Sequence, residues 1–135
     1  MQDLDKRDFD ARYQDGARAR LEVTGGANPL PDLETVSDFM RPFREHMGLL
    51  FNEVWNRPGL GRRERALIMV ALLAALNRNE ELKYYLEIAL ACGVTRDEIQ
   101  EVLLQGVHYC GSLAGVQSFR VAERLFAEID AGAAK

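Results

Sequence analysis

Three side chains with complementary chemistry lie close together in the sequence: Arg78, Glu81 and Tyr85. In a helix, residues three and seven positions apart share one side, so the three groups can act on one small molecule. The arginine can bind a carboxylate through two parallel hydrogen bonds, the glutamate can orient the arginine or carry a proton, and the phenol can donate a hydrogen bond. Alternatively, Tyr85 packs in the core beside Leu82 and Leu86. The spacing therefore predicts a catalytic set whose phenol has two possible roles.

The two histidines of the chain differ in their predicted surroundings. His46 follows Phe43 by three positions and precedes Leu50 by four, which places it on the apolar face of a predicted helix. We expect His46 to point inward, either as a hydrogen-bonded core residue or as a substrate-binding acid. His108 lies on a polar helix side, so we expect it to face solvent or another subunit.

The two cysteines, Cys92 and Cys110, are 18 positions apart. This spacing provides neither a CxxC redox pair nor a zinc-binding pair, so no metal site is predicted. An internal disulfide would require the fold to bring the two Cα atoms within about 7 Å. We expect both to be buried free thiols, and peroxide chemistry is the least favoured activity.

Composition excludes several classes of protein. Lys and Arg total 17 against 21 Asp and Glu, and the net charge of -4 leaves no basic stripe for a nucleic-acid backbone. The longest apolar run, 66–76, is too short to cross a membrane, and the charged segment 1–10 does not resemble a signal peptide. The sequence thus predicts a cytoplasmic protein without nucleic-acid or membrane partners.

Glycine and proline clusters at 25–31 and 58–61 divide the chain into helical segments. The N-terminal arm, residues 1–30, is predicted to be helical from Leu4 to Val23, with a thin apolar stripe that must pack on the fold or on a second subunit. The segment 34–56 repeats apolar residues at three- and four-residue steps, which predicts one helix with a single buried face.

The C-terminal block is also predicted to be helical. The segment 62–77 contains an unbroken apolar stretch, longer than a strand and rich in Ala and Leu, and is therefore expected to be a fully buried central helix. Helices follow over 80–92, which ends at Gly93, over 95–111, which begins with the capping box Thr95-Arg96-Asp97-Glu98, and over 113–129, before a frayed tail. The pattern contains no predicted strand. We expect a single all-α domain over 1–135 with its helical core at 34–129.

Several motifs in this block resemble the carboxymuconolactone decarboxylase family. They occur in the family's order, nearly without gaps from Phe39 to Phe126, and comprise the segments 55–60, 75–82, 93–99, 101–105 and 109–111 together with Arg63 and Arg65. The resemblance implies an all-α alkylhydroperoxidase-like fold that usually assembles as a hexamer built from trimers or dimers. It also implies cofactor-free decarboxylation of 4-carboxymuconolactone, a reaction of aromatic catabolism, and therefore a small carboxylated substrate and a homo-oligomer.

The sequence departs from the family pattern at its histidines. Family decarboxylases carry histidine where this chain has Tyr85, and proline, asparagine and histidine where it has Leu113, Val116 and Gln117. In the peroxide-reducing branch, two cysteines and a histidine would fall on the positions of Arg78, Glu81 and Tyr85, which excludes that thiol chemistry. Because the family pattern includes Tyr109 and the position of Gln117, we add both as candidate substrate-binding residues.

The function remains open between two classes of protein. Decarboxylation needs stabilisation of the developing negative charge and a positioned acid, for which an arginine, a glutamate and a phenol are sufficient without a metal. A phenol, with an unperturbed pKa of about 10, is a weaker acid near neutral pH than an imidazole, with about 6.5. The sequence therefore predicts a 4-carboxymuconolactone decarboxylase type of enzyme or, alternatively, a diverged lyase or isomerase, or a non-catalytic oligomer that binds a small molecule. In each case we expect Arg78, Glu81 and Tyr85 to face an enclosed cavity.

Overall fold

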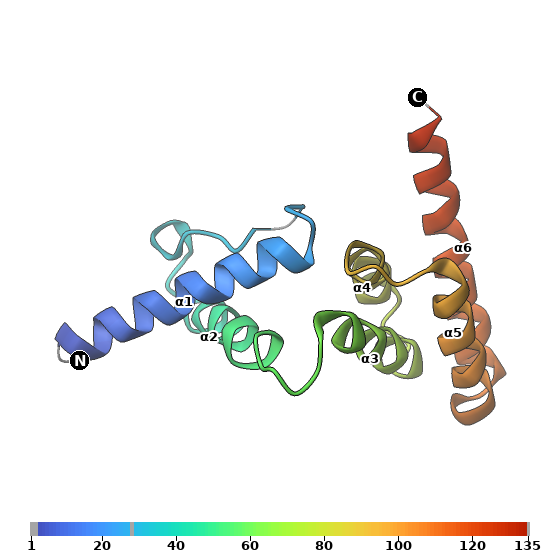
Figure 1. Ribbon diagram of the computed structural model, residues 1–135, viewed down its shortest axis with the longest axis horizontal. Coiled ribbons are helices and arrows are strands. Elements are labelled where there is room, and N and C mark those ends of the chain that lie inside the picture. The colour runs from blue at the N-terminus through green and yellow to red at the C-terminus, as the bar shows by residue number, and fades with distance from the viewer. Residues whose placement is uncertain (1–2, 28, 135) are drawn as a thin grey trace. The chain divides into compact units, whose positions relative to one another are not determined.

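The computed structural model describes residues 3–27 and 29–134, with side chains described from residue 8 onward. These residues form α-helices and short helical turns and contain no β-strand, so the predicted all-α class is confirmed (Figure 1). The chain divides into two compact units, an N-terminal unit (Met1–Arg62) and a C-terminal unit (Arg63–Lys135). That the two units make up one domain stays a prediction.

In the N-terminal unit, helix α1 (Asp3–Val23) lies across α2 (Arg41–Leu50), as Figure 1 shows. Two glycines allow the close crossing: a Cβ added to Gly16 would overlap the Gly48 carbonyl oxygen and lie 2.9 Å from its carbon. A Cβ added to Gly48 would overlap the ring of Tyr13, whose hydroxyl donates a 3.0 Å hydrogen bond to the carbonyl of Pro31. The arm is therefore a helix that packs on the fold, as predicted.

The second helical segment begins later than predicted and buries a different face. A short 3₁₀ turn, η1 (Leu33–Thr35), precedes α2, which has Pro42 in its first turn and continues into a π-helix, η2 (Phe51–Trp55). The buried residues are Gly48, Phe51 and Trp55, because α1 packs on this side. The predicted apolar face was wrong at Phe39, Phe43 and Val54, which are exposed, and right at Phe51.

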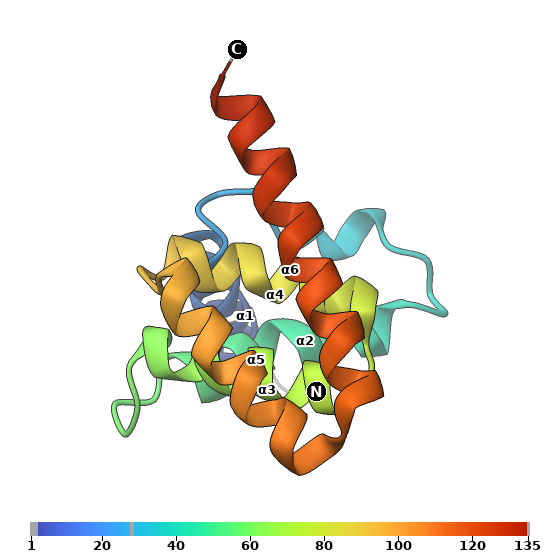
Figure 2. The ribbon, with the colours of Figure 1, turned by 90° about the vertical axis from the view of Figure 1, so that its right-hand side faces the viewer.

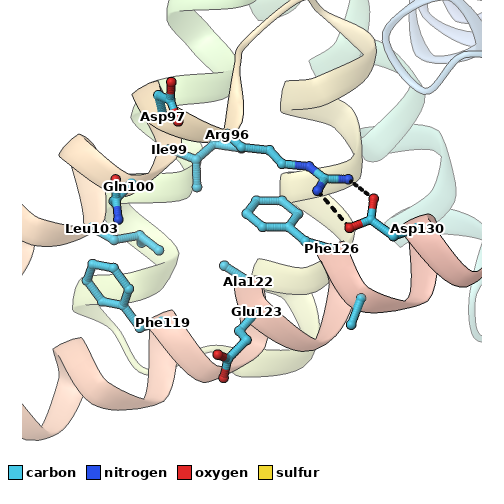
Figure 3. A pocket seen from close by; sticks show the side chains of 11 residues that line it. Arg96, Asp97, Ile99, Gln100, Leu103, Phe119, Ala122, Glu123, Phe126 and Asp130 are labelled. Atoms are coloured by element: carbon cyan, nitrogen blue, oxygen red, sulfur yellow. Dashed lines mark hydrogen bonds and ion pairs between the residues drawn. The ribbon is translucent and has the colours of Figure 1, made fainter.

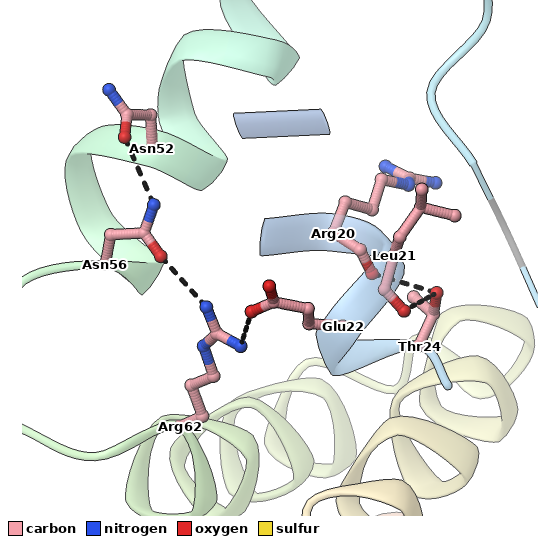
Figure 4. Close-up of polar contacts among 7 residues, drawn as sticks. All are labelled: Arg20, Leu21, Glu22, Thr24, Asn52, Asn56 and Arg62. Carbon is pink, nitrogen blue, oxygen red and sulfur yellow. Dashed lines mark hydrogen bonds and ion pairs between the residues drawn. The ribbon is translucent and has the colours of Figure 1, made fainter. Parts of the chain in front are cut away.

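A row of polar contacts connects the end of η2 to α1 (Figure 4). Asn56 donates a 3.1 Å hydrogen bond to Asn52, and Arg62 donates one of 3.1 Å to the side-chain oxygen of Asn56. Arg62 also pairs with Glu22 near the end of α1. Each of these pairs is exposed and adds little stability.

Helix α3 (Arg62–Ala75) is not fully buried, contrary to the prediction. One side, formed by Ala66, Val70, Leu73 and Ala74, is buried. The other side carries Ile68 and Leu72, which are about half exposed. An apolar helix needs neighbours on every side, and the single chain supplies them for only one face of α3.

Helices α4 (Asn79–Ala91), α5 (Arg96–Cys110) and α6 (Ser112–Ala133) complete the C-terminal unit. α5 and α6 lie side by side and antiparallel across a tight corner, as Figure 2 shows. The predicted capping box of Thr95 and Glu98 is present, and Arg63 pairs with Glu98, which connects the start of α3 to that of α5. The tail was predicted to fray, but α6 continues to Ala133, and Lys135 lies outside the described residues.

Candidate functional site

The turn between α3 and α4 fixes the backbone of Arg78. Asn77 has a φ of 57°, a left-handed conformation that asparagine tolerates better than most residues. The N–H of Asn77 donates to the carbonyl of Ala74 at 3.2 Å, and the N–H of Arg78 donates to that of Leu73 at 3.0 Å. This pair of bonds is the Schellman motif, which ends a helix. Because Arg78 is also the N-cap residue of α4, two helix ends hold its backbone.

The side chains of Arg78 and Glu81 lie on the same side of the start of α4, as their spacing predicts. Nη1 of Arg78 lies 3.5 Å from Oε1 of Glu81, a long contact. The two side chains are 64% and 52% exposed, so the expectation of an enclosed cavity around them is wrong for the single chain. Water weakens an ion pair of this kind, and Arg78 can turn toward a ligand at little cost.

Tyr85 is half-buried. This burial is intermediate between the accessible hydroxyl of a substrate-binding residue and the fully buried ring of a core residue. Its ring packs edge to face against Tyr84, with the centroids 5.4 Å apart. Leu82 and Leu86, on the neighbouring side of α4, are fully buried. Tyr85 therefore has a packed ring with part of its surface accessible.

The three residues predicted to bind substrate lie apart from the start of α4. His46 is exposed in the N-terminal unit, so the prediction that it points inward was wrong, because α1 covers the opposite side of α2. Tyr109 is 77% exposed near the end of α5, where its ring packs edge to face with that of His108, the centroids 5.1 Å apart. Gln117 is exposed in the second turn of α6. Whether any of them binds substrate stays a prediction.

A groove of about 280 Å³ lies between the start of α4 and α6, and Asn79, the residue that follows Arg78, lines it. Lys83 and Glu128 form an ion pair of 2.6 Å on its wall, and the hydrogen bond to Glu128 raises the pKa of Lys83. Arg124 lines the same groove. Lys83 was not among the residues predicted from the sequence, although its four-residue spacing from Asn79 places both on one helix side.

A larger groove of about 450 Å³ lies between α5 and α6 (Figure 3). Arg96 extends across the ring of Phe126, 4.7 Å from its centroid, and donates hydrogen bonds of 3.1 and 2.7 Å to the two carboxylate oxygens of Asp130. The hydrogen bond from Arg96 lowers the pKa of Asp130. Because its arginine is already paired, this groove offers a carboxylate substrate no available cation.

Neither cysteine lines either of these two grooves. Cys92 is half-buried and Cys110 is exposed, and neither forms a disulfide, so the expectation of burial was wrong for Cys110. Within the described residues, no group of three or more histidine, cysteine or acidic side chains is arranged to hold a metal ion. The same part of the chain contains no helix that is both long and apolar enough to span a membrane.

Comparison with known sequences yields one family and two relatives. A family described as the carboxymuconolactone decarboxylase family matches residues 42–124. A 4-carboxymuconolactone decarboxylase of Acinetobacter baylyi is 36% identical over 119 residues, which cover 87% of this chain and 89% of the relative. A nitrosuccinic acid decarboxylase, npaB, of Metarhizium robertsii is 30% identical over 113 residues, which cover 83% of this chain and 79% of the relative.

Proposed function

This chain belongs to the carboxymuconolactone decarboxylase family, and from that premise we propose that it is a cofactor-free carboxy-lyase acting on 4-carboxymuconolactone or a related small acid. The observation that carries the proposal is the match to a decarboxylase over nearly the whole length of both chains. The second relative, also a decarboxylase, acts on a different acid. Loss of carbon dioxide is therefore the reaction that the two relatives share.

The direction of charge movement defines the role of Arg78. As the bond to the departing carboxylate breaks, negative charge leaves that group and moves toward the electron-withdrawing part of the substrate. A cation on the departing carboxylate would stabilise the bound substrate more than the transition state and would slow the reaction. Arg78 therefore binds an oxygen that remains in the product, such as a second carboxylate, and the name of nitrosuccinic acid denotes a dicarboxylic acid.

Tyr85 and Glu81 supply the remaining chemistry in this proposal. The Tyr85 hydroxyl donates a hydrogen bond to the oxygen on which charge collects, and Glu81 orients Arg78 across the 3.5 Å contact or carries the proton to the product carbon. A positioned acid or donor is worth about 10² to 10⁴ in rate. We also propose substrate contacts for His46, Tyr109 and Gln117, each of which is exposed in the single chain.

A second copy of the chain is the partner that can close the site. Seven large apolar side chains of the C-terminal unit are each more than 40% exposed: Ile68, Leu72, Leu76, Leu104, Tyr109, Leu113 and Val116. We refer to them as the apolar surface. Leu76 is two residues from Arg78, so a subunit that covers this surface also reduces the exposure of the site. Large exposed apolar patches are typical of protein interfaces, and we propose a homo-oligomer, a hexamer or a trimer.

The decisive experiment measures turnover by the purified chain. Loss of the ultraviolet absorbance of 4-carboxymuconolactone, together with release of carbon dioxide, is the expected result. Absence of turnover of this lactone and of nitrosuccinate by the wild-type chain would defeat the decarboxylase proposal for these acids. Saturable binding of the lactone without turnover would favour the non-catalytic oligomer, an alternative that the exposure of Arg78 and Glu81 supports.

Variants at Tyr85 then separate a chemical role from a packing role. We expect Tyr85→Phe to lower kcat by about 10² or more while the fold is kept, because only the hydroxyl is lost. Tyr84→Phe is the matched control, since its ring contacts Tyr85 and the same atom is removed. Tyr85→His introduces the family residue and should retain activity. Equal rates for Tyr85→Phe and the wild type would show that Tyr85 only packs.

A further inference from the structure

The groove between α5 and α6 has the features of a ligand site that the proposed decarboxylation does not use. Its floor contains the buried side chains of Ile99, Leu103 and Ala122, and the rings of Phe119 and Phe126 point into the space between the helices (Figure 3). Its volume of about 450 Å³ lies within the range of small-molecule pockets, about 300 to 1,000 Å³. We propose that this groove binds a small organic cation with an apolar body.

The charged side chains that line the groove indicate whether its ligand is a cation or an anion. Asp97, Glu123 and Asp130 line it together with a single cation, Arg96. Asp130 takes both of the hydrogen bonds that Arg96 donates, so these two charges compensate each other. Within the described residues, Asp97 and Glu123 have no hydrogen bond or ion pair. Three carboxylates against one arginine leave the lining with a net negative charge, which attracts a cation and repels the acids on which the proposed enzyme acts.

The aromatic side chains specify how the cation is held. A cation within about 6 Å of a ring centroid is attracted to the ring face. Arg96 already makes this contact with Phe126 at 4.7 Å, which shows that the groove accommodates a cation over an aromatic ring. Phe119 provides a second ring in the same groove. The ligand class is therefore an ammonium or guanidinium group on an aromatic or aliphatic body that fills the apolar floor.

Two probes of similar shape and opposite charge test the proposal on the full-length protein. Ligand-observed NMR would compare 2-phenylethylammonium with 3-phenylpropionate. We expect the ammonium to bind with a Kd on the order of 1 mM, as suits a ligand of its size, and the carboxylate to bind at least about tenfold more weakly. Equal or tighter binding of the carboxylate would overturn the proposal, as would the absence of binding by either probe.

Substitutions place the binding in this groove. The double variant Asp97→Asn, Glu123→Gln and the single variant Phe119→Leu should each weaken ammonium binding at least about threefold, because they remove the uncompensated charge or the ring face. Glu101→Gln is the matched control, since Glu101 is an exposed carboxylate on α5 that does not line the groove. Circular dichroism would check that each variant is folded. Equal weakening by the control would mean that the probe responds to net charge alone, and the proposal would be wrong.

Discussion

Substitution of Gly16 by alanine tests the crossing of α1 and α2, because two effects of opposite sign compete there. Alanine is favoured over glycine inside a helix by about 1 kcal/mol. The added Cβ would, however, overlap the Gly48 carbonyl oxygen and lie 3.2 Å from the backbone nitrogen of Asn52. Both are backbone atoms of the opposing helical segment, so no side-chain rotation relieves the overlap and the two helices must separate.

The size of the effect follows from this comparison. Overpacking costs about 1 to 3 kcal/mol, and separation of the helices also weakens the packing of Tyr13 against Gly48. We expect the cost to exceed the gain in helix propensity, with a net loss of about 1 to 2 kcal/mol. This loss corresponds to a decrease in Tm of about 2 to 8 °C per kcal/mol for domains near this size.

Thermal unfolding followed by circular dichroism measures the effect, with Gly132→Ala as the control. Gly132 lies in the last turns of α6, and an added Cβ there meets nothing within 4 Å, so alanine should leave Tm unchanged or raise it. A Gly16→Ala variant as stable as the wild type, or more stable, would refute the close crossing of α1 and α2.

Three further predictions concern the C-terminal unit. The hydrogen bond from the N–H of Thr95, together with the one from Arg63, lowers the pKa of Glu98. The stability that ionised Glu98 contributes is therefore fully present above the pKa of an unfolded glutamate, about 4.3. It is lost as the pH falls through the lower pKa of Glu98 in the folded protein. Glu98→Gln should therefore flatten the dependence of Tm on pH in this acid range, and an unchanged dependence would contradict the assignment. If the chain assembles as proposed, Leu72→Glu should convert the proposed oligomer to a smaller species in light scattering, whereas Leu60→Glu, at an exposed leucine of the other unit, should not. Arg78→Lys should raise KM for the lactone by about tenfold with a smaller effect on kcat, because lysine keeps the charge but loses the forked contact, and an unchanged KM would remove Arg78 from the site.

The sequence was sufficient to predict the helices where their ends depend on local chemistry. The capping box of Thr95 and Glu98 and the left-handed Gly93 fix two boundaries through hydrogen bonds between neighbours in the chain. The family was likewise predicted from motifs in the right order, and the comparisons confirmed it. The shared side of Arg78 and Glu81 followed from their spacing. Apart from the family, each of these features depends on residues only a few positions apart.

Only the tertiary structure decided which helix faces are covered. His46 and Phe43 are exposed because α1 packs on the Gly48 side of α2. This packing depends on the close approach of Gly16 to Gly48, 32 positions apart in the sequence. The apolar α3 is covered on one face only. Its exposed Ile68 and Leu72 are the reason for proposing a second copy of the chain, because the single chain does not bury them. The sequence determined where most of the α-helices lie through local hydrogen bonds and the spacing of apolar residues, but not the 3₁₀ turn η1 or the π-helix η2. The burial of a face depends on contacts between distant segments, which no local pattern specifies.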